Sequence, residues 1–264
     1  MHGTCIEIGG MAILVRTESP EFFGILEERY GGGFVNPSAE PLFALDVEIV
    51  PPGSNSDPDA EASVRFEGGR WVLERGDFYA EWNPGLGRGY IRQGAYPYAM
   101  DAVLRILHSL LLVRQGGLLI HAASGVRNGR AFLFSGVSGA GKTTISRLAP
   151  QDVTLLTDEI SYVRRDGDGY RAFGTPFAGE LAKVGENISA PVAALYFLAQ
   201  GPENRIETMA PAEAGRTLLR NILFFAEDAE LVKLVFDAAC EFVSKVPVYR
   251  LTFVPDGRVW DLIV

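Results

Sequence analysis

Short apolar runs separated by turn residues fill the first hundred positions of the chain. The runs alternate apolar and polar residues and are rich in β-branched and aromatic side chains, while Gly, Pro and Asn stand between them, which is typical of strands joined by turns. The expected strands cover residues 42–50, 62–67, 71–75, 78–82 and 90–93. We therefore predict an antiparallel β-rich region over residues 1–98, in which the Pro-, Ser- and Asp-rich segment 51–59 is an excursion from a hairpin.

The periodicity changes to that of a helix at residues 99–113, and Gly116-Gly117 ends it. Two apolar runs follow, 118–123 and 131–134, and the turn Arg127-Asn128-Gly129 between them predicts a hairpin. Further strands are expected at 153–156, 193–198 and 248–254, and further helices at 144–148, 211–225 and 228–244. The pattern predicts a mixed α/β fold, with residues 99–264 as its core domain.

The charge balance, the N-terminus and the cysteines indicate which classes of protein are excluded. Lys and Arg number 24 against 33 Asp and Glu, a net charge of −9, which argues against a protein that neutralises nucleic-acid phosphates. The first ten residues lack the features of a signal peptide, the most apolar stretch is too short to span a bilayer, and the two cysteines form no metal or disulfide pattern. We expect a cytoplasmic protein that binds neither nucleic acid nor membranes.

Residues 136–143 read GVSGAGKT and match the P-loop pattern GxxxxGK[ST]. An apolar strand leads in and a helix leads out, so backbone N–H groups and the helix start can surround phosphate oxygens. Lys142 is predicted to bridge the β- and γ-phosphates of ATP, and the Thr143 hydroxyl to bind Mg²⁺. The alternative is a glycine-rich turn without function. The predicted nucleotide-binding residues are Gly136, Val137, Ser138, Gly139, Ala140, Gly141, Lys142, Thr143 and Thr144.

Two further features stand near the P-loop in the sequence. The apolar run 153–156 leads through Thr157 to Asp158-Glu159, and carboxylates at a strand end beside a P-loop can hold Mg²⁺ or accept a proton from an attacking hydroxyl. His121 ends the run 118–120, directly before the predicted hairpin. The other interpretations are solvated loop acids for the pair and a hydrogen-bonded structural residue for the histidine.

Residues 118–123, 136–144 and 155–159 together resemble the bacterial HPr serine kinase/phosphorylase group, whose fold is related to phosphoenolpyruvate carboxykinase. The resemblance is greater to short, divergent members, some of which act on peptide serines in natural-product pathways. It implies a carboxykinase-like nucleotide core behind the β-rich region. It also implies that His121 lies near the acceptor hydroxyl, that Asp158 is the base, and that Lys142 and Thr143 are the P-loop pair.

The chain departs from that family at several positions. Thr144 stands where the full-length enzymes have Glu, and Glu159 stands where they have a second Asp. Their segment for the phosphorylase reaction has no clear counterpart; the nearest candidate is 174–180, in which Glu180 is a possible metal-side acid. HPr as the substrate and a reverse phosphorylase reaction are therefore unsupported.

The sequence favours an ATP- and Mg²⁺-dependent kinase that transfers the γ-phosphate to a hydroxyl, with serine of a protein or peptide favoured as the acceptor. Asp158, His121 and Lys142 are its predicted catalytic residues, and Thr143, Asp158, Glu159 and Glu180 its predicted metal ligands. Two alternatives remain open: a nucleotide-binding regulatory or interaction module without transfer activity, and a small-molecule kinase on the same core. Both keep the P-loop, so the sequence does not separate them, and the oligomeric state stays open.

Overall fold

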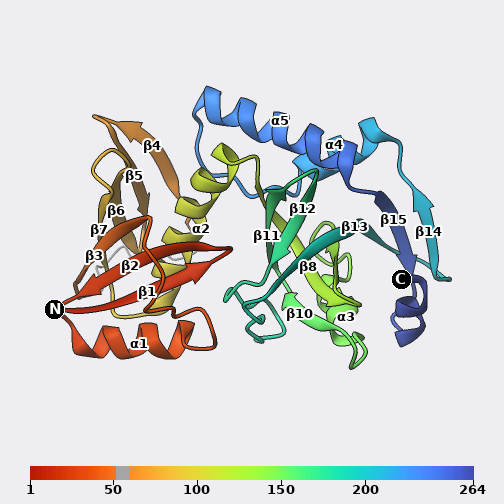
Figure 1. The fold of residues 1–264 in the computed structure, drawn as a ribbon, viewed down its shortest axis with the longest axis horizontal. Helices are drawn as coiled ribbons and strands as arrows, with labels where there is room; N and C mark the ends of the chain where they lie inside the picture. Colours follow the sequence, from red (N-terminus) through yellow and green to blue (C-terminus); the bar gives the residue numbers. More distant parts are fainter. Residues whose placement is uncertain (52–59) are drawn as a thin grey trace. The chain divides into compact units, whose positions relative to one another are not determined.

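The computed structural model describes residues 1–51 and 60–264, which form two compact units (Figure 1). One unit comprises residues 1–110 and 224–232, and the other residues 111–223 and 233–264. The division predicted after residue 98 thus lies close to the start of helix α2 (Pro97–Arg114), whereas the units divide within that helix. Most of the proline-rich segment predicted at 51–59 lies outside the described residues.

The first unit contains one seven-stranded sheet and helix α1 (Pro20–Tyr30). Its strand order is β1-β2-β3-β7-β6-β5-β4. The bounds are β1 His2–Ile8, β2 Met11–Thr17, β3 Phe43–Ile49, β4 Ser63–Glu67, β5 Arg70–Arg75, β6 Phe78–Asn83 and β7 Arg88–Gln93. All five predicted strands are therefore present as β3 to β7, with ends shifted by at most two residues.

The predicted antiparallel arrangement is present in four pairings of this sheet, β1–β2, β4–β5, β5–β6 and β6–β7. It is wrong for β3, which lies parallel to both β2 and β7. Parallel neighbours need a crossover connection, and α1 with the loop after it supplies the one between β2 and β3. We did not predict β1, β2 or α1, although each has a local signal. Gly9 and Gly10 form the turn between β1 and β2 with positive φ angles of 63° and 70°, and Ser19 caps the first turn of α1.

The second unit contains an eight-stranded sheet with the order β10-β8-β11-β12-β13-β15-β14, while β9 pairs with both β8 and β13. Its strands are β8 Leu118–Arg127, β9 Arg130–Ser135, β10 Thr154–Thr157, β11 Ile160–Asp166, β12 Gly169–Phe173, β13 Ser189–Gln200, β14 Arg205–Thr208 and β15 Val248–Phe253. The pairings β13–β9 and β13–β15 are parallel and the others antiparallel. Both sheets are mixed, so the predicted mixed α/β class is confirmed.

The predicted hairpin before the P-loop is confirmed as β8–β9. Asn128 and Gly129 form its turn with φ angles of 53° and 73°, the two positive values that a type I′ turn requires. Helix α3 (Lys142–Arg147) follows the P-loop, and the remaining helices are α4 (Pro211–Leu219), α5 (Ala229–Lys245) and the short 3-10 helix η1 (Gly257–Leu262).

Helix α4 ends at Leu219, six residues before the predicted end at 225. The reason is tertiary: the backbone of residues 221–223 bonds to β8 instead of continuing the helix. Ile222 forms a bridge with Ile120, and Leu223 N donates to Leu119 O at 2.8 Å. Strands β11, β12 and β14 were also missed.

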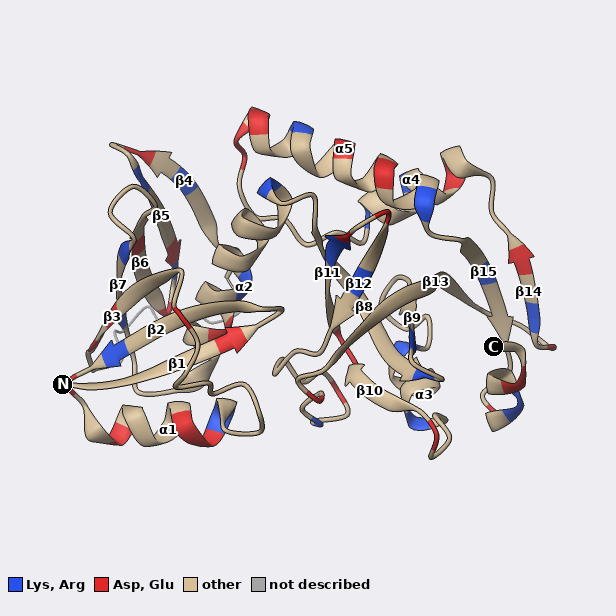
Figure 2. Cartoon of the chain, in the orientation of Figure 1, with Lys and Arg blue, Asp and Glu red and all other residues tan. Residues whose placement is uncertain are grey.

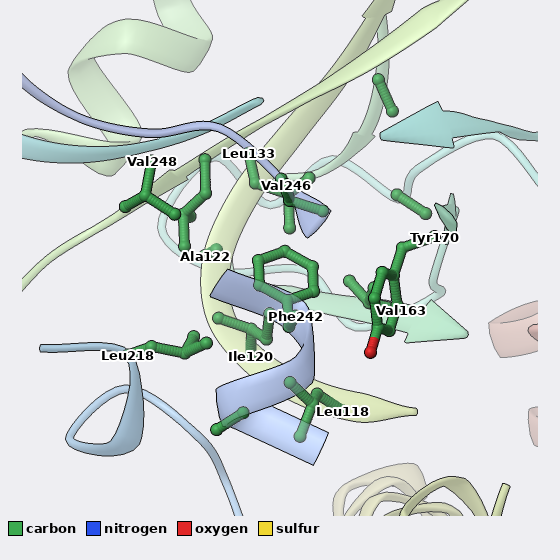
Figure 3. Close-up of a cluster of buried hydrophobic side chains, with 14 of the residues drawn as sticks. Leu118, Ile120, Ala122, Leu133, Val163, Tyr170, Leu218, Phe242, Val246 and Val248 are labelled. Atoms are coloured by element: carbon green, nitrogen blue, oxygen red, sulfur yellow. The ribbon is translucent and has the colours of Figure 1, made fainter. Parts of the chain in front are cut away.

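Alternate residues of β8 and β9 enter two different apolar clusters, so this hairpin is buried on both faces. Leu118, Ile120 and Leu133 belong to the cluster that includes Phe242 of α5. Figure 3 shows Phe242 in the middle of that cluster, and its ring meets Tyr170 edge-on at 4.9 Å between centroids. Phe132 and Phe134 point to the other cluster, which includes Ile145 of α3 and Trp260. The two cores hold the hairpin and thereby the loop that follows it.

Charged residues of both signs are mixed along α5 (Figure 2). Lys233 pairs with Asp237, and Lys245 with Glu241, one helical turn away in each case. No helix within residues 1–51 and 60–264 is long and apolar enough to cross a membrane.

Candidate functional site

The P-loop connects the end of β9 to the start of α3, in the strand, loop and helix order that the motif requires. Its glycines adopt conformations that L side chains avoid: φ is 155° at Gly136, 79° at Gly139 and 111° at Gly141. Gly141 is also restricted by packing, because a Cβ there would lie 2.6 Å from the ring of Phe253. Gln200 donates to Gly139 O at 2.8 Å. The loop is therefore held from the β13 and β15 side.

Lys142 is the first residue of α3 and is largely buried. Its Nζ donates to Gly136 O at 3.0 Å and to Val137 O at 3.5 Å, so the ammonium group lies across the beginning of the loop. Burial lowers the pKa of Lys142, while the charges of Glu159 and Glu180 act in the opposite direction. Most of the Lys142 side chain is thus enclosed by the protein, although the residue still lines the cleft described below.

Asp158 follows β10 and is 4% exposed. Its Oδ1 accepts from Gly179 N at 2.8 Å and its Oδ2 from Leu181 N at 2.9 Å. The carboxylate thus holds the segment 179–181, whose central residue is Glu180. Glu180 Oε2 in turn accepts from the Thr143 hydroxyl at 3.1 Å. Three of the four predicted metal ligands are linked in this way, and the fourth, Glu159, is half-buried and acts by its charge on Lys142.

The segment that carries Glu180 folds tightly against β10. Thr175 N donates to Leu156 O at 3.0 Å, and Glu186 N to Leu155 O at 3.2 Å. A Cβ at Gly185 would lie 1.7 Å from Leu156 O, so only glycine fits there. Both ends of the segment are therefore attached to the strand that leads to Asp158.

These groups line a cleft of 270 Å³. Its lining comprises His121, Ser138, Gly139, Gly141, Lys142, Thr143, Thr144, Asp158, Glu159, Gly179 and Glu180. Of the predicted site residues, Gly136 and Val137 line a neighbouring pocket instead, and Ala140 packs into the core. The structure thus brings together the acids, the histidine and most of the P-loop.

His121 lies in β8 beside the end of β9 and lines the cleft half-buried. Its backbone N donates to Asn221 O at 2.7 Å, and its O accepts from the Ser135 hydroxyl at 2.7 Å. Burial is the larger cause and the charge of Lys142 the smaller one that together lower the pKa of His121 below the ordinary 6.5. The imidazole is therefore neutral at neutral pH, with one nitrogen able to accept a hydrogen bond.

Replacing Lys142 with Met should raise the pKa of His121 toward its ordinary value, because one of the two causes of the lowering is removed. An NMR titration measures this without any nucleotide. His108, fully buried, has its pKa lowered by burial to about 3 and does not titrate in the same range, and the signal is assigned from a His121→Gln variant. Lys183→Met in the segment after Glu180 is the control; an unchanged His121 titration in Lys142→Met would contradict the proximity of the two groups.

The same lowered pKa has a consequence for stability. The unfolded chain binds a proton at His121 at a higher pH than the folded chain does. The contribution of His121 to the free energy of unfolding is therefore fully present above about pH 6.5, and it is lost as the pH falls through the pKa of His121 in the folded chain.

The cleft offers oxygen atoms that suit Mg²⁺, which takes one or two carboxylates in addition to phosphate oxygens. The Thr143 hydroxyl and the Glu180 carboxylate already converge at 3.1 Å, and Glu159 lies on the same cleft wall. Within residues 1–51 and 60–264, no group of three or more His, Cys, Asp or Glu side chains is arranged to hold a metal ion by itself. The Thr143 hydroxyl and the two carboxylates are oxygen donors of the kind that Mg²⁺ takes in addition to phosphate oxygens.

Sequence reasoning missed a group of residues on the other side of His121. Arg220, Asn221 and Arg250 line the neighbouring pocket together with Gly136 and Val137. The sequence placed Arg220 and Asn221 inside a helix predicted to continue to 225. In the structure α4 ends at Leu219, and the chain then bonds to the backbone of His121. A polar Arg-Asn pair just after the last apolar residues of α4 is the local signal that was available.

Residues 98–264 match the model of a family described as SynChlorMet cassette protein ScmC. Comparison with curated proteins found no match. Among solved structures, the Hpr(Ser) kinase/phosphatase from Coxiella burnetii is similar over 55% of this chain and 90% of that chain, with 12% sequence identity and a TM-score of 0.29. So low a score carries no argument about function. The matched family residues make up more than half of the chain, and the chain therefore belongs to the family of SynChlorMet cassette protein ScmC.

Proposed function

We propose that this ScmC family member is an ATP- and Mg²⁺-dependent phosphotransferase that moves the γ-phosphoryl group to a hydroxyl, with a protein or peptide serine as the favoured acceptor. One observation carries the proposal: a single cleft joins a P-loop lysine, a Thr–Glu oxygen pair, a buried Asp and a neutral His. An HPr-kinase-like core over residues 99–264 belongs to the same proposal.

Phosphate binding rests on the loop backbone and on Lys142. In the structure, the ammonium group is bonded to the carbonyls of Gly136 and Val137. It would exchange these neutral acceptors for phosphate oxygens, which form stronger, charge-assisted bonds. A fixed cation beside the transferring group then stabilises the charge that develops in the transition state.

Thr143, Glu180 and Glu159 would hold the magnesium ion, with Asp158 keeping Glu180 in place through the backbone of residues 179–181. Bound Mg²⁺ neutralises phosphate charge. Asp158 itself also lines the cleft, so it is both a positioning group and the proposed base.

In the proposed reaction the acceptor hydroxyl oxygen attacks the γ-phosphorus, and the bond from that phosphorus to the β–γ bridging oxygen breaks. ADP leaves, and the hydroxyl proton passes to Asp158. His121, neutral and lining the same cleft, would donate its ring N–H to the hydroxyl oxygen and orient the hydroxyl while its proton points to Asp158. Each carboxylate oxygen of Asp158 already accepts one backbone N–H, which fixes the direction of its remaining lone pairs.

The proposal is tested with ATP labelled at the γ-phosphate, Mg²⁺ and a library of serine-containing peptides. Label should appear on peptides in the wild type, and ATP labelled at the α-phosphate should leave the peptides unlabelled, since only the terminal phosphoryl group moves. Calorimetry on the same protein measures MgATP binding. If MgATP binds but no label reaches any hydroxyl acceptor, the protein is a nucleotide-binding module and the transfer proposal fails.

A further inference from the structure

A second pocket, of 420 Å³, lies beside the phosphate cleft in the same unit. It shares His121 and Ser138 with that cleft, while Gly136 and Val137 line only the second pocket. Lys142 donates to the carbonyls of these last two residues. Lys142, which lines the phosphate cleft, is therefore bonded to two residues that line the second pocket.

The remaining walls combine apolar and basic groups. Phe197 and Met209 are buried and form an apolar side, while Arg220 and Arg250 contribute guanidinium groups. Arg250 is already paired with Glu213 at 2.5 Å. Arg220 is exposed and has no ion-pair partner within residues 1–51 and 60–264. A guanidinium group that lacks an internal partner suits a carboxylate, which it can bind through two parallel hydrogen bonds.

The backbone at Arg220 is fixed relative to His121. Arg220 follows the last residue of α4, and the next residue, Asn221, accepts a hydrogen bond from His121 N at 2.7 Å. Asn221 Nδ2 also donates back to Thr217 O at 2.8 Å. The backbone of Arg220 is thus fixed, because the next residue is hydrogen-bonded to the backbone of His121 in β8.

We propose that this second pocket is the acceptor subsite, and that Arg220 selects an acceptor serine with an acidic residue beside it. The inference rests on the proposed function and specifies its substrate class. A hydroxyl placed in this pocket faces His121 and the start of the P-loop, while a neighbouring carboxylate reaches Arg220. Arg250 contributes less, because Glu213 offsets its charge.

Two peptides test the proposal, identical except for Glu or Gln beside the serine. Their binding to the nucleotide-free protein is measured by fluorescence anisotropy, and their phosphorylation by steady-state kinetics. The Glu peptide should bind roughly tenfold more tightly, the size expected when hydrogen bonds to a charged group are gained. Arg220→Ala should remove this preference by raising KM for the Glu peptide with little change in kcat. Arg216→Ala, one helical turn earlier and outside the pocket lining, is the matched control.

Arg220→Glu extends the test, because it should reverse the preference toward a peptide with Lys beside the serine. Equal binding of the Glu and Gln peptides to the wild type would overturn the inference, and so would an Arg220→Ala protein that keeps the preference. If label transfer occurs under either of these outcomes, the proposed function stands without the inference. If no label moves to any peptide, the proposed function fails, and the anisotropy measurement still decides whether Arg220 recognises acidic peptides.

Discussion

Replacing Lys142 with Met is expected to slow phosphoryl transfer by roughly 10²–10³-fold, the usual cost of removing one group that stabilises transition-state charge. Methionine keeps a long flexible chain in the largely buried position, so the packing around α3 is preserved. The carbonyls of Gly136 and Val137 lose their partner, but these residues line the neighbouring pocket, where water can replace it. Single-turnover kinetics measure the transfer rate, calorimetry measures the affinity for MgATP, and thermal melting measures whether the fold is preserved.

Lys183→Met is the control, because Lys183 is exposed and outside the cleft lining. It should match the wild type in rate, in MgATP affinity and in melting temperature. Equal MgATP affinity and undiminished transfer in Lys142→Met would show that the P-loop lysine does not hold the phosphates, and the phosphate-binding assignment would then have to be abandoned.

Replacing Asp158 with Asn is expected to reduce transfer by roughly 10²–10⁴-fold, the range for loss of a positioned base. The structure adds a second effect. An amide has only one oxygen, so it can accept from Gly179 N or from Leu181 N but its NH₂ group cannot replace the other bond. Glu180 should therefore be less well placed, and MgATP affinity should fall together with the rate. Because both bonds are only partly buried, the donor left without a partner should cost less than the roughly 1–3 kcal/mol of a fully buried one, and the melting temperature should fall by at most a few degrees.

Glu180→Gln separates the two effects, because it leaves the bonds of Asp158 to residues 179 and 181 intact. Rates measured against Mg²⁺ concentration should show a higher requirement for Mg²⁺ in Glu180→Gln and recovery when the ion is in excess. Asp158→Asn should remain slow at every Mg²⁺ concentration. Near-normal turnover in Asp158→Asn would show that Asp158 is neither the base nor the group that positions Glu180. Glu159 would then be the better candidate for the base.

Elements with strong local signals could be predicted from the sequence. The β8–β9 turn is an example, since Asn-Gly is the dipeptide that adopts two positive φ angles most easily. The apolar stripe of α5 is another, because the residues at helical spacing are all buried: Leu231, Val235, Ala238 and Phe242. The P-loop context follows the same rule, because its strand, glycines and helix are contiguous in the chain.

Strand order and direction could not be predicted in the same way. The pairing of β3 with β2 and β7 joins segments separated by a helix and by three other strands, and nothing in the alternation of one strand states the direction of its neighbour. The end of α4 is a similar case. Residues 221–223 have an apolar pattern that suits a helix, but they bond to β8, and that competition exists only in the folded chain.

By itself the sequence determined which groups are available at the candidate site: the glycines that permit the loop conformation, one lysine, a histidine after an apolar run and the acids after β10. Only the tertiary structure decided how they work together. Thr143 and Glu180 meet across 37 positions of sequence, and Asp158 reaches the backbone at 179 and 181 across more than 20. Arg220 lines the same pocket as His121 because α4 stops where the chain bonds to β8. Such contacts depend on the packing of distant segments, which local propensity does not encode.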